Sequence, residues 1–475
     1  MISGLKPYPA MKDSAVEWLG AVPADWKVLR TAHLLREVDV RSKTGTETHL
    51  SMSQRLGLVP SSEMEERRLV SESYVGAKLC QVDDLVLNRL KAHLGVFARA
   101  SQPGLVSPDY TVLRPVSPQG TTAFLEYVLK SMSCRSELRM RAKGLVEGFW
   151  RLYTDDFYQI KLPVPPIHEQ AAIVRFLDHA DRRIGRYIRA KQKLIKLLEE
   201  QKQTIIHSAV TRGLDSRWRL QPSGVDWLGH VPEHWEVVRN KVVCRLGTGH
   251  TPSRKIDEYW RNCDIPWFTL GDVHQIRGDK VKYVFDTNER VSELGLANSA
   301  AVRLPAGTVI LSRTASVGFS AILGCEMATS QDFMAWTPGE RVFGEYLLAV
   351  LRAMRPEFKR LMYGSTHNTI YMPTLHAFRM PLPPRSEQEA IVRYVDDVLK
   401  SCDKTVAGAE REVALLREYR TRLIADIVTG KLDVREAAAR LPADAEEVET
   451  PDEIDPETDP AEAVGLDAVP AEAEV

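Results

Sequence analysis

Two segments of the chain carry apolar residues at alternating steps of four and three, which is typical of a helix that packs lengthwise against another helix. At roughly 1.5 Å per residue, about 44 residues form a helix of roughly 65 Å, and so narrow a stripe needs a partner. We therefore predict that the two helices pair with each other as a coiled coil. The first line of positions is Ile173, Leu177, Ala180, Ile184, Tyr187, Lys191, Leu194, Leu198, Gln201 and Ile205. The second is Ile391, Val395, Val398, Cys402, Thr405, Ala409, Glu412, Leu416, Tyr419 and Leu423.

These helices belong to an internal duplication. The stretch "VEWLGAVPADWKVLR" at 16–30 returns as "VDWLGHVPEHWEVVR" at 225–239, and "LPVPPIHEQAAIVRFLD" at 162–178 returns as "MPLPPRSEQEAIVRYVD" at 380–396. The regions between these repeats barely align. The chain is therefore expected to contain two copies of one structural frame, each of which carries a different variable region.

This organisation predicts an α+β protein with a pseudo-twofold internal repeat. Two globular domains of mixed α/β structure are expected to be joined by the two long helices and followed by a disordered acidic tail. The expected limits are 1–161 for the first domain, 162–215 for the first repeated helix region, 216–379 for the second domain, 380–433 for the second repeated helix region and 434–475 for the tail.

Charge is divided unevenly along the chain. Residues 442–475 hold five Asp and eight Glu with no Lys or Arg, so residues 1–441 carry 63 basic and 51 acidic groups, a formal charge of +12. A Pro-, Ala- and acid-rich segment without aromatic residues cannot bury enough apolar surface to fold alone. The tail is either a solubilising appendage or a competitor of nucleic acid for the basic body.

A basic stripe follows the first helix. Its members lie two positions beyond successive apolar positions, about 200° round the helix from them. The stripe is either a solvated face or a surface that attracts a phosphate backbone or an acidic partner. The five residues are Arg182, Arg186, Arg189, Lys193 and Lys196.

Motifs for catalysis are missing. There is no GxxxxGK[ST] phosphate loop, no strand followed by GxGxxG, and no DPPY-like, HExxH or GxSxG sequence. Six scattered cysteines form no CxxC pair, so neither a disulfide framework nor a metal site is indicated. No run of 18 apolar residues and no signal-peptide pattern appears, which favours a cytoplasmic protein without a membrane segment. A binding protein is favoured over an enzyme.

The duplicated pattern, in which each variable region is followed by a Pro-Pro-x-x-Glu-Gln helix, resembles the DNA specificity subunit of type I restriction-modification enzymes. The stretches "LGTGHTPSRKIDEYWRNCDIPWFTLGDV" at 246–273 and "NRLKAHLGVFARASQPGLVSPDYTVLRP" at 88–115 are similar to target-recognition domains of this family. The resemblance covers about residues 6–433 and leaves out the acidic tail.

The resemblance implies a protein that has no catalysis of its own. Each target-recognition domain would read one half of a bipartite site on double-stranded DNA, and the helices would pack antiparallel and set the spacing. Two methyltransferase subunits and the motor-nuclease subunits would be the partners. S-adenosylmethionine would be held by the methyltransferase, and ATP and Mg²⁺ by the motor, so this chain would bind no cofactor. Because the inserts differ, we expect an asymmetric target with unlike halves.

Candidate DNA contacts are polar and basic residues in loops, because Arg and Lys suit guanine and phosphate, Asn and Gln suit adenine, and hydroxyls suit phosphate. In the first domain we nominate Arg89, Lys91, His93, Arg139, Arg141 and Lys143. In the second domain we nominate Thr251, Ser253, Arg254, Lys255, Arg313, Thr314, Ser316, Tyr363, Ser365, Thr366, His367 and Asn368.

The repeated tryptophans are assigned a different role. Trp18, Trp26, Trp227 and Trp235 recur in both copies, and readers of different half-sites should not share their reading residues. We therefore predict that these side chains join each variable domain to the helical frame.

Two rival interpretations remain open. The chain could be a fused restriction-methyltransferase with unrecognised catalytic motifs, which methyl transfer by the chain alone would reveal. It could also be a coiled-coil adaptor that never touches DNA, against which the basic body and the two divergent inserts count.

Overall fold

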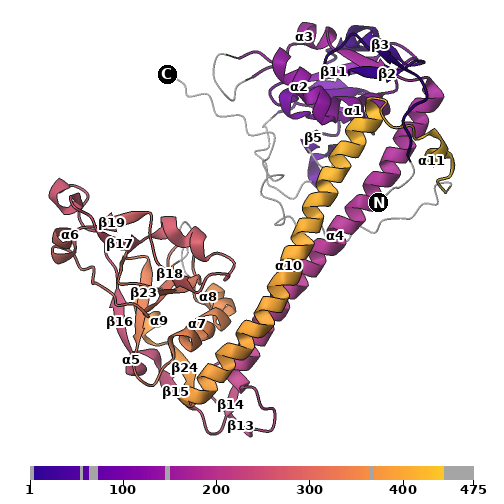
Figure 1. Ribbon diagram of the computed structural model, residues 1–475. Helices are drawn as coiled ribbons and strands as arrows, with labels where there is room; N and C mark the ends of the chain where they lie inside the picture. The colour runs from indigo at the N-terminus through magenta and orange to yellow at the C-terminus, as the bar shows by residue number, and fades with distance from the viewer. Residues whose placement is uncertain (1–4, 54–56, 64–72, 145–149, 363–368, 443–475) are drawn as a thin grey trace. The chain divides into compact units, whose positions relative to one another are not determined.

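The computed structural model describes residues 5–53, 57–63, 73–144, 150–362 and 369–442 (Figure 1). The chain divides into two compact units. Unit 1 comprises residues 1–192 and 411–475, and unit 2 comprises residues 193–410. The division falls inside both long helices, so each unit combines a globular part with a portion of each helix.

Unit 1 contains a four-stranded antiparallel sheet in the order β4-β11-β8-β9. Its strands are β1 (Met11–Asp13), β2 (Ala21–Pro23), β3 (Lys27–Arg30), β4 (Leu35–Val38), β5 (Leu50–Ser53), β6 (Gly57–Pro60), β7 (Lys78–Cys80), β8 (Leu85–Asn88), β9 (Phe97–Arg99), β10 (Gly104–Val106), β11 (Tyr110–Pro115) and β12 (Lys161–Val164). Its helices are η1 (Thr31–His33), η2 (Ser61–Glu63), η3 (Ala92–Leu94), α1 (Thr122–Lys130), α2 (Met132–Arg141), α3 (Thr154–Tyr158), α11 (Arg435–Ala439) and parts of α4 (Ile167–Arg212) and α10 (Arg385–Val428).

The strand β8 explains why this sheet is covered on both faces. Its residues are all buried, and successive side chains point to opposite faces of a strand. Leu85 and Leu87 join the core that includes Phe124 of α1. Val86 joins a second core with Leu50 of β5. The sheet is therefore packed between helices on one face and short strands on the other.

Unit 2 repeats this plan with a five-stranded sheet in the order β16-β23-β20-β21-β18 and a three-stranded sheet β19-β17-β22. Its strands are β13 (Leu220–Pro222), β14 (His230–Pro232), β15 (Glu236–Arg239), β16 (Cys244–Thr248), β17 (Ile265–Phe268), β18 (Tyr283–Val284), β19 (Glu289–Val291), β20 (Val309–Ser312), β21 (Ser320–Leu323), β22 (Ala328–Thr329), β23 (Phe333–Pro338) and β24 (Arg379–Leu382). Its helices are α5 (Asn240–Val243), η4 (Asp257–Trp260), η5 (Leu270–Ile276), α6 (Glu293–Ala297), α7 (Gly344–Ala353), α8 (Arg355–Leu361), α9 (Met372–His376) and the remainder of α4 and α10.

Both units are mixed α/β structures, as predicted. Most strand pairs are antiparallel, and the parallel pairs β17–β22 and β18–β21 lie in unit 2. The central strand β20 alternates as β8 does, with Val309 and Leu311 facing the core that contains α7, and Ile310 facing Phe268 and its neighbours.

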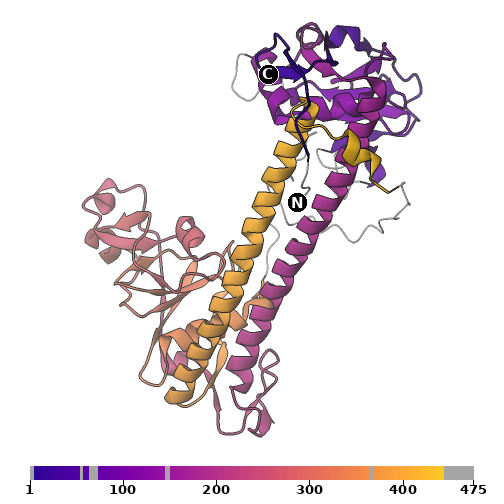
Figure 2. The ribbon, with the colours of Figure 1, turned by 45° about the vertical axis from the view of Figure 1, so that its right-hand side comes forward.

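The helices α4 and α10 pack against each other within each unit (Figures 1 and 2). In unit 1, Arg420 donates to Asp181, and Lys191 Nζ lies 2.8 Å from Glu412 Oε2. In unit 2, Lys202 Nζ lies 2.7 Å from Asp403 Oδ1. Because numbers fall along α10 as they rise along α4, the two helices of unit 1 run antiparallel.

The predicted contact line along α4 is wrong in its middle. Tyr187 and Leu194 were expected to face the partner helix, but they are 52% and 38% exposed. Ile188 and Ile195 are half-buried in their place, and Lys202 is buried. Nine steps between buried or half-buried positions lead from Ile173 to Ile206, which are 33 residues apart. The average spacing is therefore nearer to the 3.6-residue turn of a straight helix than to the 3.5-residue repeat of a supercoil.

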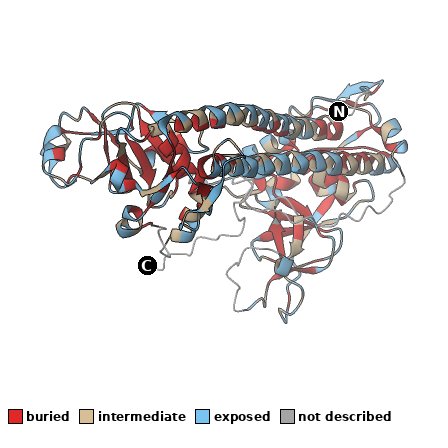
Figure 3. Cartoon of the chain, turned by 90° about the horizontal axis from the view of Figure 1, so that it is seen from below, coloured by how far each residue is buried: buried red, intermediate tan, exposed pale blue. Residues whose placement is uncertain are grey.

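The line on α10 departs from the prediction in the same way. Thr405 and Glu412 are exposed, whereas the adjacent Val406 and Val413 are buried. Exposed residues dominate the middle of both helices (Figure 3). Strict alternation of four and three steps therefore fails on both helices, although their pairing was correctly expected.

The predicted tail begins too early. Residues 434–442 were assigned to a disordered segment, but α11 is helical, and Val434 and Ala438 are buried in the core of unit 1. Arg175 of α4 donates to the backbone oxygens of Leu441 and Pro442 at 3.1 and 2.9 Å. Val434 and Ala438 pack with residues of α4 and α10 in this core. The prediction missed this packing because it was based on the acidic composition of the tail as a whole. Residues 443–475 lie outside the described residues.

Across the ranges that the structure describes, no helix is both long enough and apolar enough to cross a membrane.

Candidate nucleic-acid interface

A glutamate in the first turn of each long helix joins the helix to the repeated tryptophan motif. In unit 1, Glu169 is 2% exposed and accepts hydrogen bonds from Trp26 Nε1 at 3.0 Å and Tyr8 Oη at 2.5 Å. In unit 2, Glu387 accepts a 3.0 Å hydrogen bond from Trp235 Nε1. The carboxylates also lie where the positive end of the helix dipole stabilises negative charge. The predicted joining role is confirmed for Trp26 and Trp235.

The glutamine that follows each glutamate completes this joint. Gln170 accepts from Thr121 N at 2.8 Å and donates to the backbone oxygens of Gln119 and Pro165. Gln388 accepts from Phe343 N at 2.8 Å and likewise donates to two backbone oxygens. Because Thr121 and Phe343 are the N-cap residues of α1 and α7, the glutamine orients a domain helix in each unit.

Both joints lie near one end of the central sheets. In unit 1, Leu35 and Pro115 pair at the end that follows β3, whereas Asn88 and Tyr110 pair at the opposite end. The loops after β4 and β8 and the loop before β11 therefore leave the sheet at the end away from the joint. In unit 2, the register places the ends of β16 and β20 and the start of β23 together in the same way.

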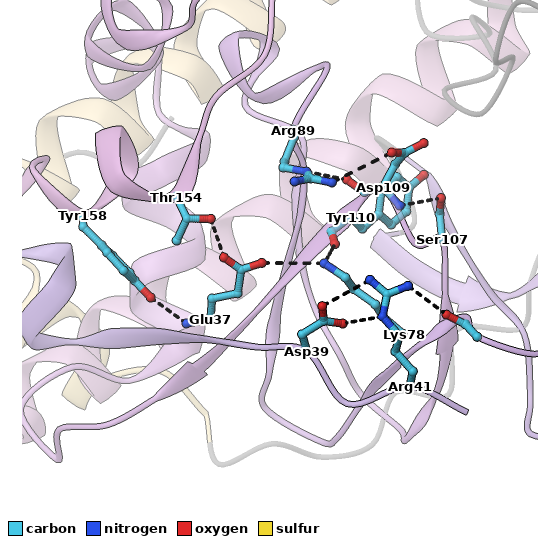
Figure 4. Close-up of polar contacts among 11 residues, drawn as sticks. Glu37, Asp39, Arg41, Lys78, Arg89, Ser107, Asp109, Tyr110, Thr154 and Tyr158 are labelled. Atoms are coloured by element: carbon cyan, nitrogen blue, oxygen red, sulfur yellow. Dashed lines mark hydrogen bonds and ion pairs between the residues drawn. The ribbon is translucent and has the colours of Figure 1, made fainter. Parts of the chain in front are cut away.

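Arg89 lies at this loop end in unit 1 (Figure 4). Its Nε donates to the backbone oxygen of Asp109 at 2.8 Å, and its own backbone oxygen accepts from Leu152 N at 3.0 Å. Beside it, buried Lys78 donates to the Tyr110 backbone oxygen at 2.8 Å and lies 3.6 Å from Glu37. Arg89 is thus tied to the strand frame by backbone contacts.

His93 and Arg139 share one aromatic neighbour. The His93 ring meets Trp150 edge to face at 5.2 Å, and the Arg139 guanidinium lies 5.2 Å from the centre of the same indole. Burial, and then the charge of Arg139, lower the pKa of His93 and favour its neutral form. His93 is therefore placed as a packed ring, whereas Arg139 is exposed on α2.

The other nominated residues of unit 1 lie nearby on the same elements. Lys91 precedes η3 and is half-buried. Arg141 is paired with Glu137 on α2 at 2.6 Å, and Lys143 is paired with Asp156 at 2.8 Å.

In unit 2, residues from three separate loops meet at Gln331. Its side-chain oxygen accepts from Thr251 Oγ1 at 2.7 Å, and its backbone oxygen accepts from Arg313 Nε at 2.9 Å. Thr314 forms an isolated bridge with Thr369, and Ser316 lies on the same loop. The structure therefore brings Thr251, Arg313 and Thr314 together.

The partners of Arg254 lie outside this group. Its guanidinium stacks 4.2 Å over the Trp260 ring and donates to Glu289 at 2.5 Å. Ser253 and Lys255, on either side of it, are exposed. The nominated residues 363–368, namely Tyr363, Ser365, Thr366, His367 and Asn368, lie outside the described residues.

Arg89 and Arg313 occupy equivalent places in the two units. Each follows a central strand and donates Nε to a backbone oxygen just before the paired strand. Each also accepts at its backbone oxygen, from Leu152 N and Ile370 N respectively. Readers of different half-sites should not share their reading residues, as was argued for the tryptophans. Because both units share this arrangement, we assign the two arginines to support of the fold rather than to reading of DNA.

The basic stripe on α4 is exposed at all five predicted positions, Arg182, Arg186, Arg189, Lys193 and Lys196. The unit division separates Arg182, Arg186 and Arg189 from the two lysines. Its contact with DNA or a partner stays a prediction.

Sequence reasoning missed Gln331, Trp150 and Asp109. Each lies beside a strand end or a candidate loop, but their contacts come from residues distant in the sequence. Their position next to a strand end or a candidate loop is the signal by which the sequence could have identified them. Over the described part of the chain, no cluster of His, Cys, Asp and Glu has the form of a metal site.

Comparisons with known proteins agree with this architecture. The profile of the type I restriction modification DNA specificity domain matches residues 71–197 and 232–414. The type I restriction enzyme MjaIX specificity subunit of Methanocaldococcus jannaschii is 30% identical over 193 residues, which cover 40% of this chain and 44% of that protein. The putative type I restriction enzyme MjaX specificity subunit of the same organism is 21% identical over 433 residues, or 88% of this chain and 96% of that protein.

A solved structure supports the fold. A chain from a study of complex assembly and conformational transition of the type I restriction-modification system has a TM-score of 0.66 at 19% identity, and the match covers 86% of this chain and 98% of that one. Since the family profile covers more than half of the sequence, this chain belongs to the family of type I restriction-modification DNA specificity subunits.

Proposed function

We propose that this chain is a non-catalytic specificity subunit whose two globular domains each read one half of an asymmetric bipartite site on double-stranded DNA. The observation that carries the proposal is that equivalent joints hold unlike loops. Glu169 with Trp26 and Glu387 with Trp235 repeat the same contact. The loop ends differ, with His93 and Trp150 packed in unit 1 and Thr251 bound to Gln331 in unit 2.

The nominated side chains differ in how available they are for reading. Arg139, Ser253, Arg254 and Lys255 are exposed and suit contacts with phosphate or bases. Arg89, Arg313 and His93 are engaged by the frame and suit support of the loops. The proposed DNA-facing set is completed by Lys91, Arg141, Lys143, Thr251, Thr314, Ser316, Tyr363, Ser365, Thr366, His367 and Asn368.

The long helices are proposed to act as an antiparallel spacer. Their packing within each unit supports this role, and the exposed basic stripe offers a surface to DNA or to acidic partner surfaces. Two methyltransferase subunits and motor-nuclease subunits would be the partners. S-adenosylmethionine, ATP and Mg²⁺ would then be bound by those subunits, and this chain would bind none of them.

Sequencing of methylated DNA tests this function. Cells that produce the chain with its methyltransferase should methylate one motif with two unlike halves separated by an unspecified spacer. A palindromic or contiguous motif would contradict the proposal. Purified chain incubated with DNA and S-adenosylmethionine should transfer no methyl group, and transfer without partner subunits would favour the fused-enzyme alternative.

A further inference from the structure

The turn before β23 is held at the loop end of unit 2 by close backbone contacts. His250 N donates to the Thr329 backbone oxygen at 3.1 Å. A Cβ at Gly249 would lie 1.9 Å from that same oxygen, so glycine is required for this approach. The turn that contains Gln331 and the loop that contains Thr251 are therefore in close backbone contact.

The Gln331 side chain is exposed but anchored at one atom. Its Oε1 accepts from Thr251 Oγ1, which orients the amide, and its backbone oxygen is bound by Arg313. An amide oxygen has two lone pairs and the nitrogen has two donors. Thr251 occupies one lone pair, and among the described residues Nε2 donates no hydrogen bond.

Other glutamines near the frame have no amide donor to spare. The Gln170 amide accepts from both Thr121 N and Thr121 Oγ1 and donates twice, and the Gln388 amide accepts once and donates twice. Gln275 donates to Asp272 and to the Asp286 backbone oxygen. Gln331 thus differs from them by presenting both an acceptor and a donor at the surface.

The position also differs between the units. Tyr110 pairs with Asn88 in unit 1 as Phe333 pairs with Ser312 in unit 2. The arginine that follows the central strand binds the backbone oxygen of Asp109 in unit 1 and of Gln331 in unit 2. A carboxylate only accepts hydrogen bonds, whereas a carboxamide both accepts and donates them, so the side chain at this place offers a donor in unit 2 alone.

A carboxamide with a free acceptor and a free donor matches the major-groove edge of adenine, where N6 donates and N7 accepts. We propose that Gln331 reads an adenine in the half-site recognised by unit 2, and that Thr251 and Arg313 are positioning residues that hold its amide and its backbone. This assignment rests on the proposed function.

The experiment compares methylation motifs of the wild-type complex and of Gln331→Ala, with the partner subunits unchanged. In the variant, discrimination at one adenine of one half-site should fall about 10-fold, while the other half-site is unaltered. Gln331→Glu keeps the shape but loses the donor, so it should lose the adenine preference too. Thr251→Val should weaken the same position. Gln275→Ala is the matched control and should leave the motif unchanged.

The outcomes separate the two proposals. An unaltered motif and unaltered efficiency in both Gln331 variants would overturn the adenine assignment while leaving the proposed function intact. A wild-type complex that methylates no bipartite motif would overturn the proposed function itself. Thermal unfolding of each purified variant shows whether it folds, and an unfolded Gln331→Ala leaves Gln331→Glu to decide.

Discussion

At the scale of single residues, one carboxylate in each unit has two roles. Glu169 and Glu387 were recognisable as first-turn acids, which favour a helix start. The structure adds that each receives the indole N–H of a tryptophan more than 140 residues away. In unit 1 this contact stabilises the joint because the buried carboxylate of Glu169 needs hydrogen-bond donors.

Tyr8 provides a clean test of the first joint. Burial, and then the hydrogen bond and charge of Glu169, raise the pKa of Tyr8, so its phenol remains a donor at working pH. Tyr8→Phe should lower the free energy of unfolding by about 1.5–3 kcal/mol, since it removes a hydrogen bond to a charged group. Urea unfolding measures this loss. Tyr187→Phe, at a 52% exposed position on α4, is the control and should be nearly neutral. Equal effects of the two changes would count against the joint.

At the scale of elements, the long helices show what periodicity can and cannot predict. The apolar stripes correctly indicated two long helices that pair. They placed Tyr187 and Glu412 on the contact line, whereas Ile188 and Val413 lie there. Over several turns, a straight helix drifts by about 20° per heptad relative to a strict seven-residue repeat, so an assumed register loses the true line.

Two leucines on α10 test the observed contact line. Leu423 is 5% exposed and packs in the core of unit 1, whereas Leu415 is 59% exposed. Leu423→Ala should cost about 2–5 kcal/mol of folding free energy, because it removes a buried side chain and leaves a cavity. Leu415→Ala should change stability by less than about 0.5 kcal/mol. Denaturant unfolding of both variants is the measurement, and a larger loss for Leu415→Ala would show that the line is misplaced.

At the scale of the whole molecule, charge is the property with a direct functional consequence. The formal charge of +12 on residues 1–441 is almost cancelled by the 13 acids of residues 442–475. Basic proteins bind DNA non-specifically through phosphate contacts that weaken as salt rises. We therefore predict that the acidic segment competes with DNA for the basic body and opposes binding that does not depend on sequence.

Removal of residues 443–475 should strengthen binding to DNA that lacks the target motif. The gain should be larger at about 50 mM than at about 200 mM salt, because screening weakens charge effects. Titration of labelled DNA with the full chain and the truncated chain measures it. The cut keeps α11 and the Arg175 contacts to Leu441 and Pro442. A full-length variant with Asn and Gln in place of the tail acids should behave like the truncation, and unchanged affinity in both would identify the tail as a solubilising appendage.

The sequence by itself determined the two-unit organisation, the two long helices and the joining role of Trp26 and Trp235. Repeats and apolar periodicity are local properties of the chain and can be read without coordinates. Tertiary structure alone decided which loops meet. Thr251, Arg313 and Gln331 are separated by 18 to 80 residues, and they are neighbours because antiparallel strands bring distant loops to one end of a sheet. It also decided that α11 packs on unit 1, because burial depends on the surface that the rest of the chain provides.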